Sequence, residues 1–264
     1  MNIRFNCYKD GKHKVMTMSY DDGRIHDLRL LEIFNQYGIK GSFHLNSDKL
    51  GKDRYVSPEQ IAAYEGHEIS VHSLTHPFLE RISDEELVNE IVEDRKNLET
   101  LCGYPVRGMS YPFGTCTSEL IGKLRTLGMQ YARTVKSTGN FNLPADFMEW
   151  HPTAHHCDPK LMERLDKFKA FKHPMPLFYL WGHSYEFPDM DNWHVIENFC
   201  AAAANDPDVW YATNIEIFDY VTAMRGLRFS ADRTMVYNPS ATDVWVDVDH
   251  TPVCCAAGKV TKFC

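Results

Sequence analysis

The hydrophobic pattern of the chain switches repeatedly between the two-residue period of a strand and the 3.6-residue period of a helix. Short apolar runs predict strands, and they lie at 14–20, 39–45, 68–71, 106–111, 129–135, 176–181 and 209–212. Segments whose apolar residues recur every three or four positions predict helices, and they lie at 26–37, 57–65, 83–101, 118–127, 158–171, 191–205 and 215–224. Strand and helix therefore alternate, which predicts an α/β fold.

The connections between successive strands decide how the strands pair. Each connection is long enough for a crossover helix, which predicts parallel neighbours. Seven repeats without an obvious reversal favour a sheet that closes into a barrel over an open doubly wound sheet. From residue 227 onward, turn residues split short strand-like runs. We therefore predict a distorted (β/α)7 barrel over residues 1–225 and a small C-terminal β appendage, residues 226–264, packed on the barrel.

One long segment, 137–157, has no clear period and is rich in Asn, Pro, Trp and His. Irregular segments of this length in a compact domain usually bind ligands or move, so we predict a binding loop or a mobile loop. The segment contains His151, His155 and His156. We interpret these histidines as substrate-loop or surface groups rather than a second metal site, because few carboxylates or cysteines fall at a matching distance.

Composition narrows the classes of partner. With 264 residues, 44% of them hydrophobic, the chain can bury a large core. The 36 acidic and 28 basic residues give a net charge of -8, which argues against a nucleic acid or an anionic membrane as partner. No apolar stretch resembles a signal peptide or a membrane span, so we expect a cytoplasmic protein. The eight cysteines show no CxxC spacing, which indicates reduced thiols.

Two adjacent acids, Asp21 and Asp22, follow the first predicted strand, 14–20. Successive strand side chains point to opposite faces, so the two carboxylates share a site only if the strand has ended between them. They repel each other, and burying both in ionised form is costly without a cation or a shared proton. The pair therefore indicates a metal ion, a basic partner or full exposure to water.

His72 and His76 supply two imidazoles at positions i and i+4, which lie one above the other if this segment turns helically. With one carboxylate they make a three-ligand shell that leaves positions open for water and substrate. The other candidate groups, among them Arg133 and His183, also follow predicted strands. In a parallel barrel such positions share one rim, so they predict a single site.

Four motifs in this order resemble those of the polysaccharide deacetylases, carbohydrate esterase family 4. They are Ser19-Tyr20-Asp21-Asp22-Gly23, His72-Ser73-Leu74-Thr75-His76, Ser110-Tyr111-Pro112-Phe113-Gly114 and Leu180-Trp181-Gly182-His183. The resemblance spans about residues 14–225, and its first two motifs are specific when they occur together. It implies a hydrolase of C–N bonds other than peptide bonds, which removes acetyl groups from N-acetylated or O-acetylated carbohydrate.

For the metal, the resemblance implies Asp22, His72 and His76 as ligands. The ion would be one divalent metal, with zinc in first place and cobalt, nickel, iron or manganese as alternatives. Physical chemistry agrees with this assignment, because a bound zinc ion lowers the pKa of its water from 15.7 to about 7 and polarises a carbonyl group.

For the reaction, the resemblance implies Asp21 as the base that takes a proton from the metal-bound water. The backbone N–H of Phe113 would help to stabilise the oxyanion, and His183 would protonate the leaving amine or alcohol. Because the metal would hold Asp22 ionised, the two neighbouring carboxylates separate into two roles. Histidine suits the acid because it can be cationic near neutral pH.

The chain departs from the family pattern at the third motif. That motif usually carries an arginine two positions before its proline, where this chain has Ser110, and a tyrosine where it has Phe113. We hypothesise that Arg133, at the end of the next predicted strand, supplies the missing charge beside the base. Arg107 comes too early on its own strand to do so.

The fourth motif departs as well, because its usual Asp-x-x-Asp-Trp is not recognisable. By hypothesis, Trp150 forms the hydrophobic wall for the acetyl methyl group, and Glu186 or Asp146 orients His183. Rim aromatics are candidates for stacking on sugar rings. The substrate-binding candidates are Tyr111, Trp150, Trp181 and Glu186.

Two other functions stay open. The first keeps the fold and the metal but cleaves the C–N bond of a small amide, imide or ureide, because cell-wall polymers lie outside the cytoplasm. The second is a catalytically inactive barrel that binds glycans through its rim aromatics and its β appendage, because the arginine of the family is missing at position 110. The sequence indicates neither the sugar nor the oligomeric state.

Overall fold

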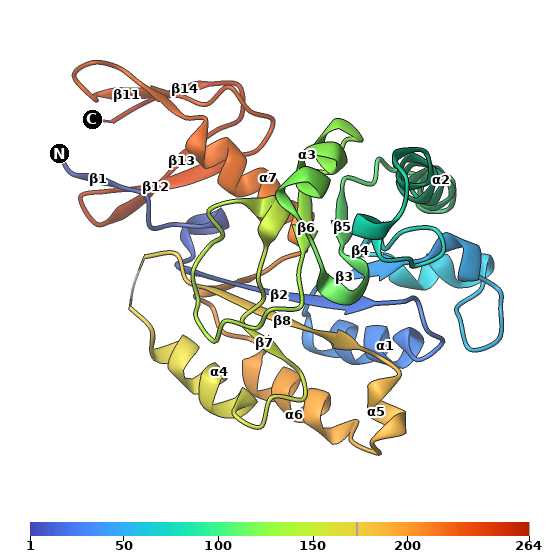
Figure 1. Cartoon of the computed structure of the whole chain (residues 1–264). Coiled ribbons are helices and arrows are strands. Elements are labelled where there is room, and N and C mark those ends of the chain that lie inside the picture. Colours follow the sequence, from blue (N-terminus) through green and yellow to red (C-terminus); the bar gives the residue numbers. More distant parts are fainter. Residues whose placement is uncertain (173, 264) are drawn as a thin grey trace.

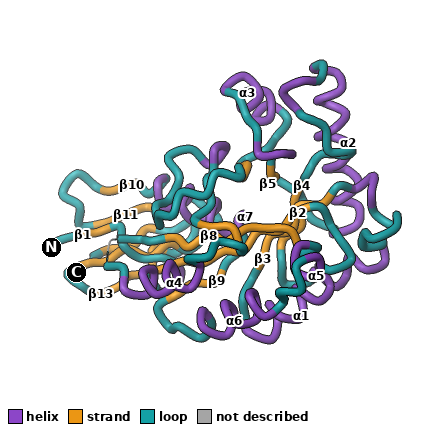
Figure 2. The backbone as a smooth tube through the Cα atoms, turned by 60° about the horizontal axis from the view of Figure 1, so that its bottom comes forward, coloured by secondary structure: helices purple, strands orange, loops and turns teal. Residues whose placement is uncertain are grey.

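A computed structural model describes residues 1–172 and 174–263 of the chain. Within these residues, parallel strands form one eight-stranded sheet with helices on both sides (Figures 1 and 2). The strands are β2 (Lys14–Asp21), β3 (Gly41–Leu45), β4 (Glu68–Val71), β5 (Gly108–Ser110), β6 (Tyr131–Arg133), β7 (Ala154–His155), β8 (Leu177–His183) and β9 (Val209–Tyr211). The predicted α/β fold is therefore confirmed.

Seven α-helices lie in the described residues, and none of them is both long and apolar enough to cross a membrane. They are α1 (Asp27–Tyr37), α2 (Asp84–Cys102), α3 (Ser118–Thr126), α4 (Leu161–Ala170), α5 (Glu186–Asp189), α6 (His194–Ala203) and α7 (Asn214–Arg225). Short 3-10 helices are Lys9–Gly11, Ser47–Lys49, Pro58–Tyr64, Leu79–Arg81, Pro112–Gly114 and Phe147–Glu149. The helix predicted at 57–65 is thus a 3-10 helix, because left-handed Gly66 ends the segment after about two turns.

The strand order is β6-β5-β4-β3-β2-β8-β7, and β2 is the centre of the sheet. One edge of β2 pairs with β8. The other edge pairs with β9 along Lys14–Met16 and with β3 along Met18–Asp21. The carboxyl end of β2 therefore lies between the carboxyl ends of β3 and β8, which places Asp21 at the middle of one rim.

Residues 150–155 connect the two edges of the sheet. The N–H of Trp150 donates to the carbonyl of Ala132 in β6 (3.0 Å), and the N–H of Thr134, which follows β6, donates to the carbonyl of Trp150 (3.0 Å). On the other side, the N–H of Thr153 donates to the carbonyl of Tyr179 in β8 (2.8 Å), and β7 pairs with β8. The prediction of an irregular loop over 137–157 is thus wrong for residues 150–155, because their backbone hydrogen bonds complete the barrel.

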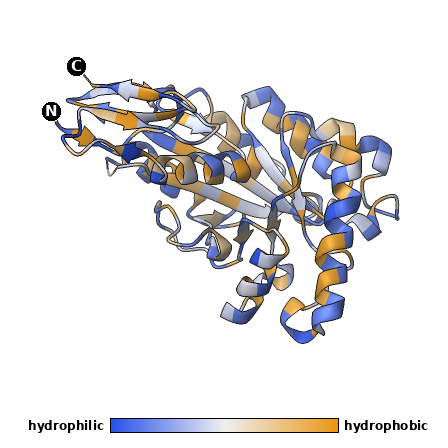
Figure 3. Cartoon of the chain, turned by 90° about the horizontal axis from the view of Figure 1, so that it is seen from above, coloured by the Kyte–Doolittle hydropathy of each residue, from blue (hydrophilic) through white to orange (hydrophobic). Residues whose placement is uncertain are grey.

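The appendage consists of two small antiparallel sheets. One is ordered β1-β12-β13 and the other β10-β11-β14, from strands β1 (Ile3–Arg4), β10 (Arg228–Phe229), β11 (Met235–Tyr237), β12 (Val244–Val248), β13 (Thr251–Cys255) and β14 (Val260–Lys262). Both ends of the chain lie in this part of the molecule, which projects from the barrel (Figures 1 and 3). The division at residue 225 stays a prediction, and Ile3–Arg4 pair with the C-terminal segment rather than with the barrel.

Candidate active site

The predicted site residues meet at the carboxyl ends of the parallel strands. Asp21 is the last residue of β2, and its direct partner on β8 is His183. Ser110 ends β5, and its direct partner on β6 is Arg133. His72 directly follows β4. The rim predicted from the sequence therefore exists, as expected for a parallel barrel.

The acid pair is divided because β2 ends between its two members. Asp21 still belongs to the strand and is 2% exposed. Asp22 leaves the strand with a φ of 79°, a left-handed value, while its N–H donates to the carbonyl of His44 (2.9 Å). The turn brings both carboxylates to the same rim, in different surroundings.

Asp22, His72 and His76 form a cluster of three potential metal ligands. The Nε2 atoms of His72 and His76 lie 3.7 and 3.9 Å from Oδ1 of Asp22, and the three donor atoms all lie within 4.8 Å of one another. These distances exceed a hydrogen bond. Two ligands that bind one zinc ion at about 2.0–2.1 Å in tetrahedral geometry are about 3.4 Å apart, so a small inward movement suffices for a shared ion.

The segment from His72 to His76 is a loop and not the helical turn that the spacing suggested. Ser73 and His76 adopt φ values of 63° and 71°, which bend the backbone so that the two rings still meet, with centroids 4.7 Å apart. The side-chain amide of Asn46 donates to the carbonyls of His72 (2.6 Å) and Ser73 (2.8 Å). The loop is thus held by hydrogen bonds rather than by helix geometry.

Two acids of α2 also hold this loop, and sequence reasoning missed both. The carboxylate of Glu90 accepts hydrogen bonds from the N–H (2.8 Å) and hydroxyl (2.6 Å) of Thr75. The carboxylate of Asp94 accepts from the N–H of His72 (3.2 Å). A signal was present, because these acids occupy the buried stripe of α2. That stripe consists of Leu87, Glu90, Ile91, Asp94 and Leu98.

The hydrogen bonds of His72 prepare it for metal binding. Its Nδ1 lies 3.0 Å from the carbonyl oxygen of Ser110, to which it donates, so Nε2 keeps its lone pair toward Asp22 and His76. Burial lowers the pKa of His72, and burial together with the charge of His72 lowers the pKa of His76 to about 4. Both rings are therefore neutral near pH 7, which is the ligating form. Two imidazoles and one carboxylate fit a divalent ion such as zinc.

Asp21 forms an ion pair with Arg133 that is almost completely buried. The guanidinium donates to Oδ2 of Asp21, and the hydroxyl of Ser110 donates to Oδ1 (3.0 Å). Burial raises the pKa of Asp21, but the charges of Arg133 and His72 outweigh it and hold the pKa well below its usual range. Arg107 instead pairs with Asp219 (2.7 Å). The structure therefore places Arg133, and not Arg107, where the hypothesis required a cation.

Trp181 supports this arginine. The Arg133 guanidinium lies 4.6 Å from the centre of the Trp181 ring, and the indole N–H donates to the hydroxyl of Ser137 (3.1 Å). Trp181 is 8% exposed. It lies at the predicted site, where it positions Arg133 through a cation–π contact.

His183 is held by Glu186. The Oε2 atom of Glu186 accepts from the backbone N–H (3.0 Å) and from Nδ1 (3.3 Å) of His183. Burial lowers the pKa of His183, but the hydrogen bond to Glu186 and the charge of Asp21 raise it above the ordinary value. Asp146, the other candidate for this role, pairs with Arg125 (2.5 Å), so that assignment is wrong.

Two other histidines lie near Glu186, and the groups His155–His156–Cys157 and His155–His183–Glu186 are each close enough to share a metal ion. That these histidines form no second metal site stays a prediction. Nε2 of His155 and of His156 lie 3.2 and 3.3 Å from the same Oε2. Nδ1 of His155 accepts from the N–H of Cys157 (3.1 Å), so its proton sits on Nε2 and points to Glu186. His156 is fully buried, so its assignment as a surface or substrate-loop group is wrong. His151 bonds elsewhere, to the hydroxyl of Thr134 (2.6 Å).

Phe113 lies beside the metal-ligand cluster. It has a φ of 58° in the 3-10 helix Pro112–Gly114, and its ring stacks on Phe78 (3.8 Å between centroids) and meets the His76 ring edge to face (4.6 Å). The ring is 48% exposed. Phe113 therefore adjoins the cluster as predicted, and offers an aromatic surface next to it.

Two predicted substrate contacts are core residues instead. Trp150 is fully buried, and its ring packs against Tyr131, Phe147 and Tyr179. Tyr111 is 1% exposed, and its hydroxyl donates to the carbonyl of Met148 (2.8 Å). Neither side chain has surface to offer a sugar, so both assignments are wrong.

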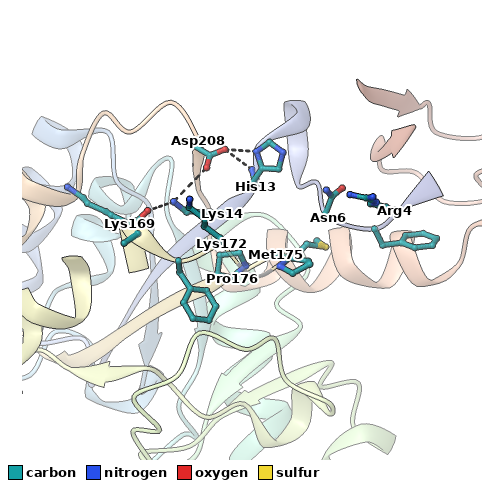
Figure 4. A pocket seen from close by; sticks show the side chains of 13 residues that line it. Arg4, Asn6, His13, Lys14, Lys169, Lys172, Met175, Pro176 and Asp208 are labelled. Atoms are coloured by element: carbon teal, nitrogen blue, oxygen red, sulfur yellow. Dashed lines mark hydrogen bonds and ion pairs between the residues drawn. The ribbon is translucent and has the colours of Figure 1, made fainter. Parts of the chain in front are cut away.

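A large cavity lies at the other end of the barrel (Figure 4). It has a volume of about 620 Å³. Lys14 opens β2, and Pro176 and Asp208 directly precede β8 and β9, so the cavity lies at the amino ends of these strands. Sites in parallel barrels lie at the carboxyl ends, where the acids and histidines meet. Cavity size therefore does not identify the active site here.

Comparison with known proteins decides the family. The family model described as Polysaccharide deacetylase matches residues 8–132, which contain the acid pair and the metal-ligand loop. The chain belongs to the polysaccharide deacetylase family. For this family member the match ends one residue before Arg133, so Arg133, His183 and Glu186 lie outside the matched region.

Individual relatives are distant. This polysaccharide deacetylase family member is 28% identical over 103 residues to a peptidoglycan-N-acetylglucosamine deacetylase of Bacillus cereus, which is 38% of this chain and 36% of that one. It spans 36% to 40% of the length of the first two curated relatives it matches.

Solved structures confirm the fold. A Mycobacterium smegmatis protein assigned to the polysaccharide deacetylases superposes with a TM-score of 0.64 at 16% identity, over 83% of this chain and 93% of that one. A CE4 family pseudoenzyme from Bacillus anthracis superposes with a TM-score of 0.50 at 16% identity, over 77% of this chain and 65% of that one. The architecture is thus the distorted barrel of this family, which holds active and inactive proteins.

Proposed function

We propose that this protein is a metal-dependent hydrolase that removes acetyl groups from N-acetylated or O-acetylated carbohydrate. The observation that supports the proposal most is the different environment of two adjacent carboxylates. Asp22 faces two neutral imidazoles, and Asp21 faces a buried guanidinium. Such a division suits one ligand and one base.

The metal would be held by Asp22, His72 and His76. The ion, with zinc as the first candidate, supplies Lewis acidity, which lowers the pKa of water and polarises the acetyl carbonyl. The chain itself fixes the ligand loop through Asn46, Glu90 and Asp94. Ligands that are oriented in this way bind more tightly than free side chains.

Asp21 accepts the proton that the attacking water loses. Arg133 keeps it ionised at neutral pH, and the Ser110 hydroxyl orients it through Oδ1. A positioned general base contributes about 10²–10⁴-fold to a rate. The low pKa of Asp21 keeps it ionised but makes it a weak base. It would therefore need a water whose own pKa is lowered.

His183 lies on the neighbouring strand and donates a proton to the leaving amine or alcohol. Glu186 fixes its tautomer, because Nδ1 donates to the carboxylate and Nε2 remains for the leaving group. The raised pKa of His183 keeps a larger fraction of the ring protonated near neutral pH. The backbone N–H of Phe113 is the proposed donor to the developing oxyanion.

Two alternatives use the same structure. The site could cleave a small amide or imide, because the chemistry of attack and leaving-group protonation is the same. An inactive glycan-binding barrel is the other alternative, and a relative of this fold is described as a pseudoenzyme. The Asp21–Arg133 pair favours the hydrolase, because it leaves an ionised carboxylate beside the ligand His72. A cytoplasmic location stays a prediction.

The test combines metal analysis with an acetate assay on N-acetylated and O-acetylated oligosaccharides. We expect one metal ion per chain, and acetate release that chelation abolishes and zinc restores. Metal without acetate release from any oligosaccharide would contradict the proposal, and hydrolysis in a panel of small amides and imides would then support the amide hydrolase. Glycan binding with neither metal nor hydrolysis would support the inactive barrel.

A further inference from the structure

Two cations and two tyrosine rings form a cluster beside the residues of the active site. The Arg24 guanidinium lies 4.4 Å from the centre of the Tyr55 ring and 5.0 Å from that of Tyr185. The Lys49 ammonium lies 5.7 Å from the centre of the Tyr55 ring. We call these four residues, Arg24, Lys49, Tyr55 and Tyr185, the cationic wall.

The cationic wall adjoins the reacting groups. The rings of Tyr185 and His183 are 5.2 Å apart, and Arg24 follows Asp22 by two residues. The Lys49 ammonium donates to the side-chain oxygen of Asn46 (3.3 Å), the residue that holds the metal-ligand loop. The wall therefore connects the acid at one side of the site with the ligand loop at the other.

Neither cation of the wall has an acidic partner. Over the described residues, no carboxylate oxygen lies within 4.0 Å of the charged nitrogens of Arg24 or Lys49, and the buried Nε of Arg24 has no hydrogen-bond partner. The chain carries 36 acidic residues and a net charge of -8, so acids are available in general. Partly buried cations without a counter-charge are unfavourable unless a ligand supplies one.

Stacking on an aromatic ring does not explain the missing partner. Arg29 also lies over a ring, 4.3 Å from the centre of Trp193, and it pairs with Glu197 (2.9 Å) as well. Of the acids in the site, Asp22 acts on both Lys49 and Tyr185, and Asp48 also acts on Lys49. Asp22 would hold the divalent ion, so it would not be free to pair with the wall.

We propose that the cationic wall binds an anionic group of the substrate, so that the preferred substrate is an N-acetyl sugar bearing a carboxylate or phosphate near the acetyl group that is removed. This inference rests on the proposed deacetylase function. A guanidinium and an ammonium bind such an anion by charge-assisted hydrogen bonds. The tyrosine faces hold the guanidinium plane and offer surface to the sugar ring.

Four matched substrates test the proposal. The first is N,N′-diacetylchitobiose, and the second is the same disaccharide with a lactyl ether on one ring, which adds one carboxylate. The third is the methyl ester of the second, which removes the charge and keeps the shape, and the fourth is the chitobiose phosphorylated at a 6-hydroxyl. We expect kcat/KM at least about tenfold higher for a charged form than for the neutral pair, since a hydrogen bond to a charged group is worth about that factor. If only one of the two charged substrates has the higher kcat/KM, that substrate shows whether the wall binds a carboxylate or a phosphate.

Variants locate the effect. Arg24→Gln and Lys49→Gln should each reduce the ratio of kcat/KM for the charged substrate to kcat/KM for the neutral one several-fold. Arg24→Lys should retain part of the preference. Arg29→Gln is the matched control, because it removes a ring-stacked arginine at a distance from the site, and it should leave the preference unchanged. Circular dichroism verifies that each variant is folded.

Equilibrium binding to chelator-treated protein separates this inference from the function on which it rests. Tighter binding of the carboxylate or phosphate sugar than of the methyl ester, lost in Arg24→Gln, supports the wall even if no acetate is released, and in that case the proposed function fails alone. Equal binding and equal kcat/KM for charged and neutral forms overturn the inference and leave the deacetylase proposal intact. The inference is also overturned if Lys49→Gln and Arg24→Gln both keep the full preference for the charged substrate.

Discussion

Arg133 and Asp21 form a buried ion pair across the mouth of the barrel. In the sheet order, β5, β4 and β3 separate their strands, so the guanidinium spans the interior of the rim rather than reaching a neighbouring strand. Ser110, which occupies the position of the usual family arginine, is the direct cross-strand partner of Arg133. In this chain the cation is therefore on β6, one strand away from the usual position on β5, and it pairs with the same aspartate.

Replacing this arginine should separate catalysis from metal binding. In Arg133→Met, Asp21 loses its buried partner, so its pKa rises and it is no longer an ionised base at neutral pH. We expect turnover to collapse by about 10²-fold or more, because a general base contributes about that factor. Metal content should be unchanged, since none of the three ligands contacts Arg133. Unchanged turnover would exclude Arg133 from the site.

The same variant should be much less stable than its control. Removing one partner of a buried ion pair costs about 3–5 kcal/mol in the free energy of unfolding. Arg107→Met removes the partly exposed pair with Asp219 and should cost about 1 kcal/mol or less. Chemical denaturation of both variants measures the difference. Equal losses in the two would show that the Asp21–Arg133 pair behaves as a surface pair.

The stability difference between wild type and Arg133→Met should depend on pH. The pKa of Asp21 is lowered in the folded protein, so the pair contributes stability above the ordinary value of 3.8 and loses it as the pH falls from there toward the lowered pKa. In the variant the pKa of Asp21 is raised, so the variant gains stability as the pH falls through that value. The difference should therefore be largest near pH 7 and shrink steadily on acidification, down to below about pH 4. A difference that grew on acidification would contradict the direction of the shift.

Neutralising the two adjacent acids one at a time should affect metal content differently. Asp21→Asn should retain the metal and lose activity by about 10²-fold or more, as the loss of a general base implies. Asp22→Asn should lose the metal together with the activity, because it removes one of three ligands. Elemental analysis beside an acetate assay measures both. Loss of metal in Asp21→Asn would show that the two roles are not separate.

Two glutamates of α2 offer a matched test of the support for the metal-ligand loop. Glu90→Ala removes both acceptors of Thr75 and should raise the Kd for zinc about tenfold to a hundredfold, the usual effect of losing a group that orients a ligand. Glu93→Ala removes an exposed partner of Lys96 and should leave the Kd unchanged. Titration of chelator-treated protein with zinc gives both values.

Glu186 should set the alkaline limit of activity. His183 must be protonated to act as an acid, so the rate falls as the pH rises through its pKa, which Glu186 helps to raise. In Glu186→Gln the pKa of His183 should fall, and the decline should occur at lower pH. Asp146→Asn, which alters the Arg125 pair instead, should leave the profile in place. A profile that does not move in Glu186→Gln would remove Glu186 from this role.

The rim could be predicted from the sequence because it depends on topology. Once the chain is read as a parallel barrel, every residue that follows a strand lies at the same end, and this brings Asp21, His72 and His183 together without any knowledge of side-chain packing. Arg133 reaches the same rim for the same reason, because its strand neighbours that of Ser110, and its role in the reaction stays a prediction. The order of the strands along the sheet is therefore a feature that the sequence pattern predicts.

Packing could not be predicted in this way. Tyr111 is an aromatic residue at a strand end, and Trp150 is predicted to stand in for the fourth-motif tryptophan of the family, but the pattern does not show which face of the backbone is covered. The histidine spacing suggested a helical turn, whereas Asn46 and two acids of α2 fix a loop. Those contacts join segments far apart in the chain, so no local pattern reports them.

The seam made by residues 150–155 has a consequence for how the base becomes active. The residues on both sides of Arg133 hydrogen-bond to Trp150, and Arg133 itself pairs with β5, so the backbone that carries the guanidinium is held between the seam and β5. The seam thus helps to hold the cation that lowers the pKa of Asp21, besides linking β6 and β8. We expect a substitution that loosens residues 150–155 to weaken the base as well as the barrel.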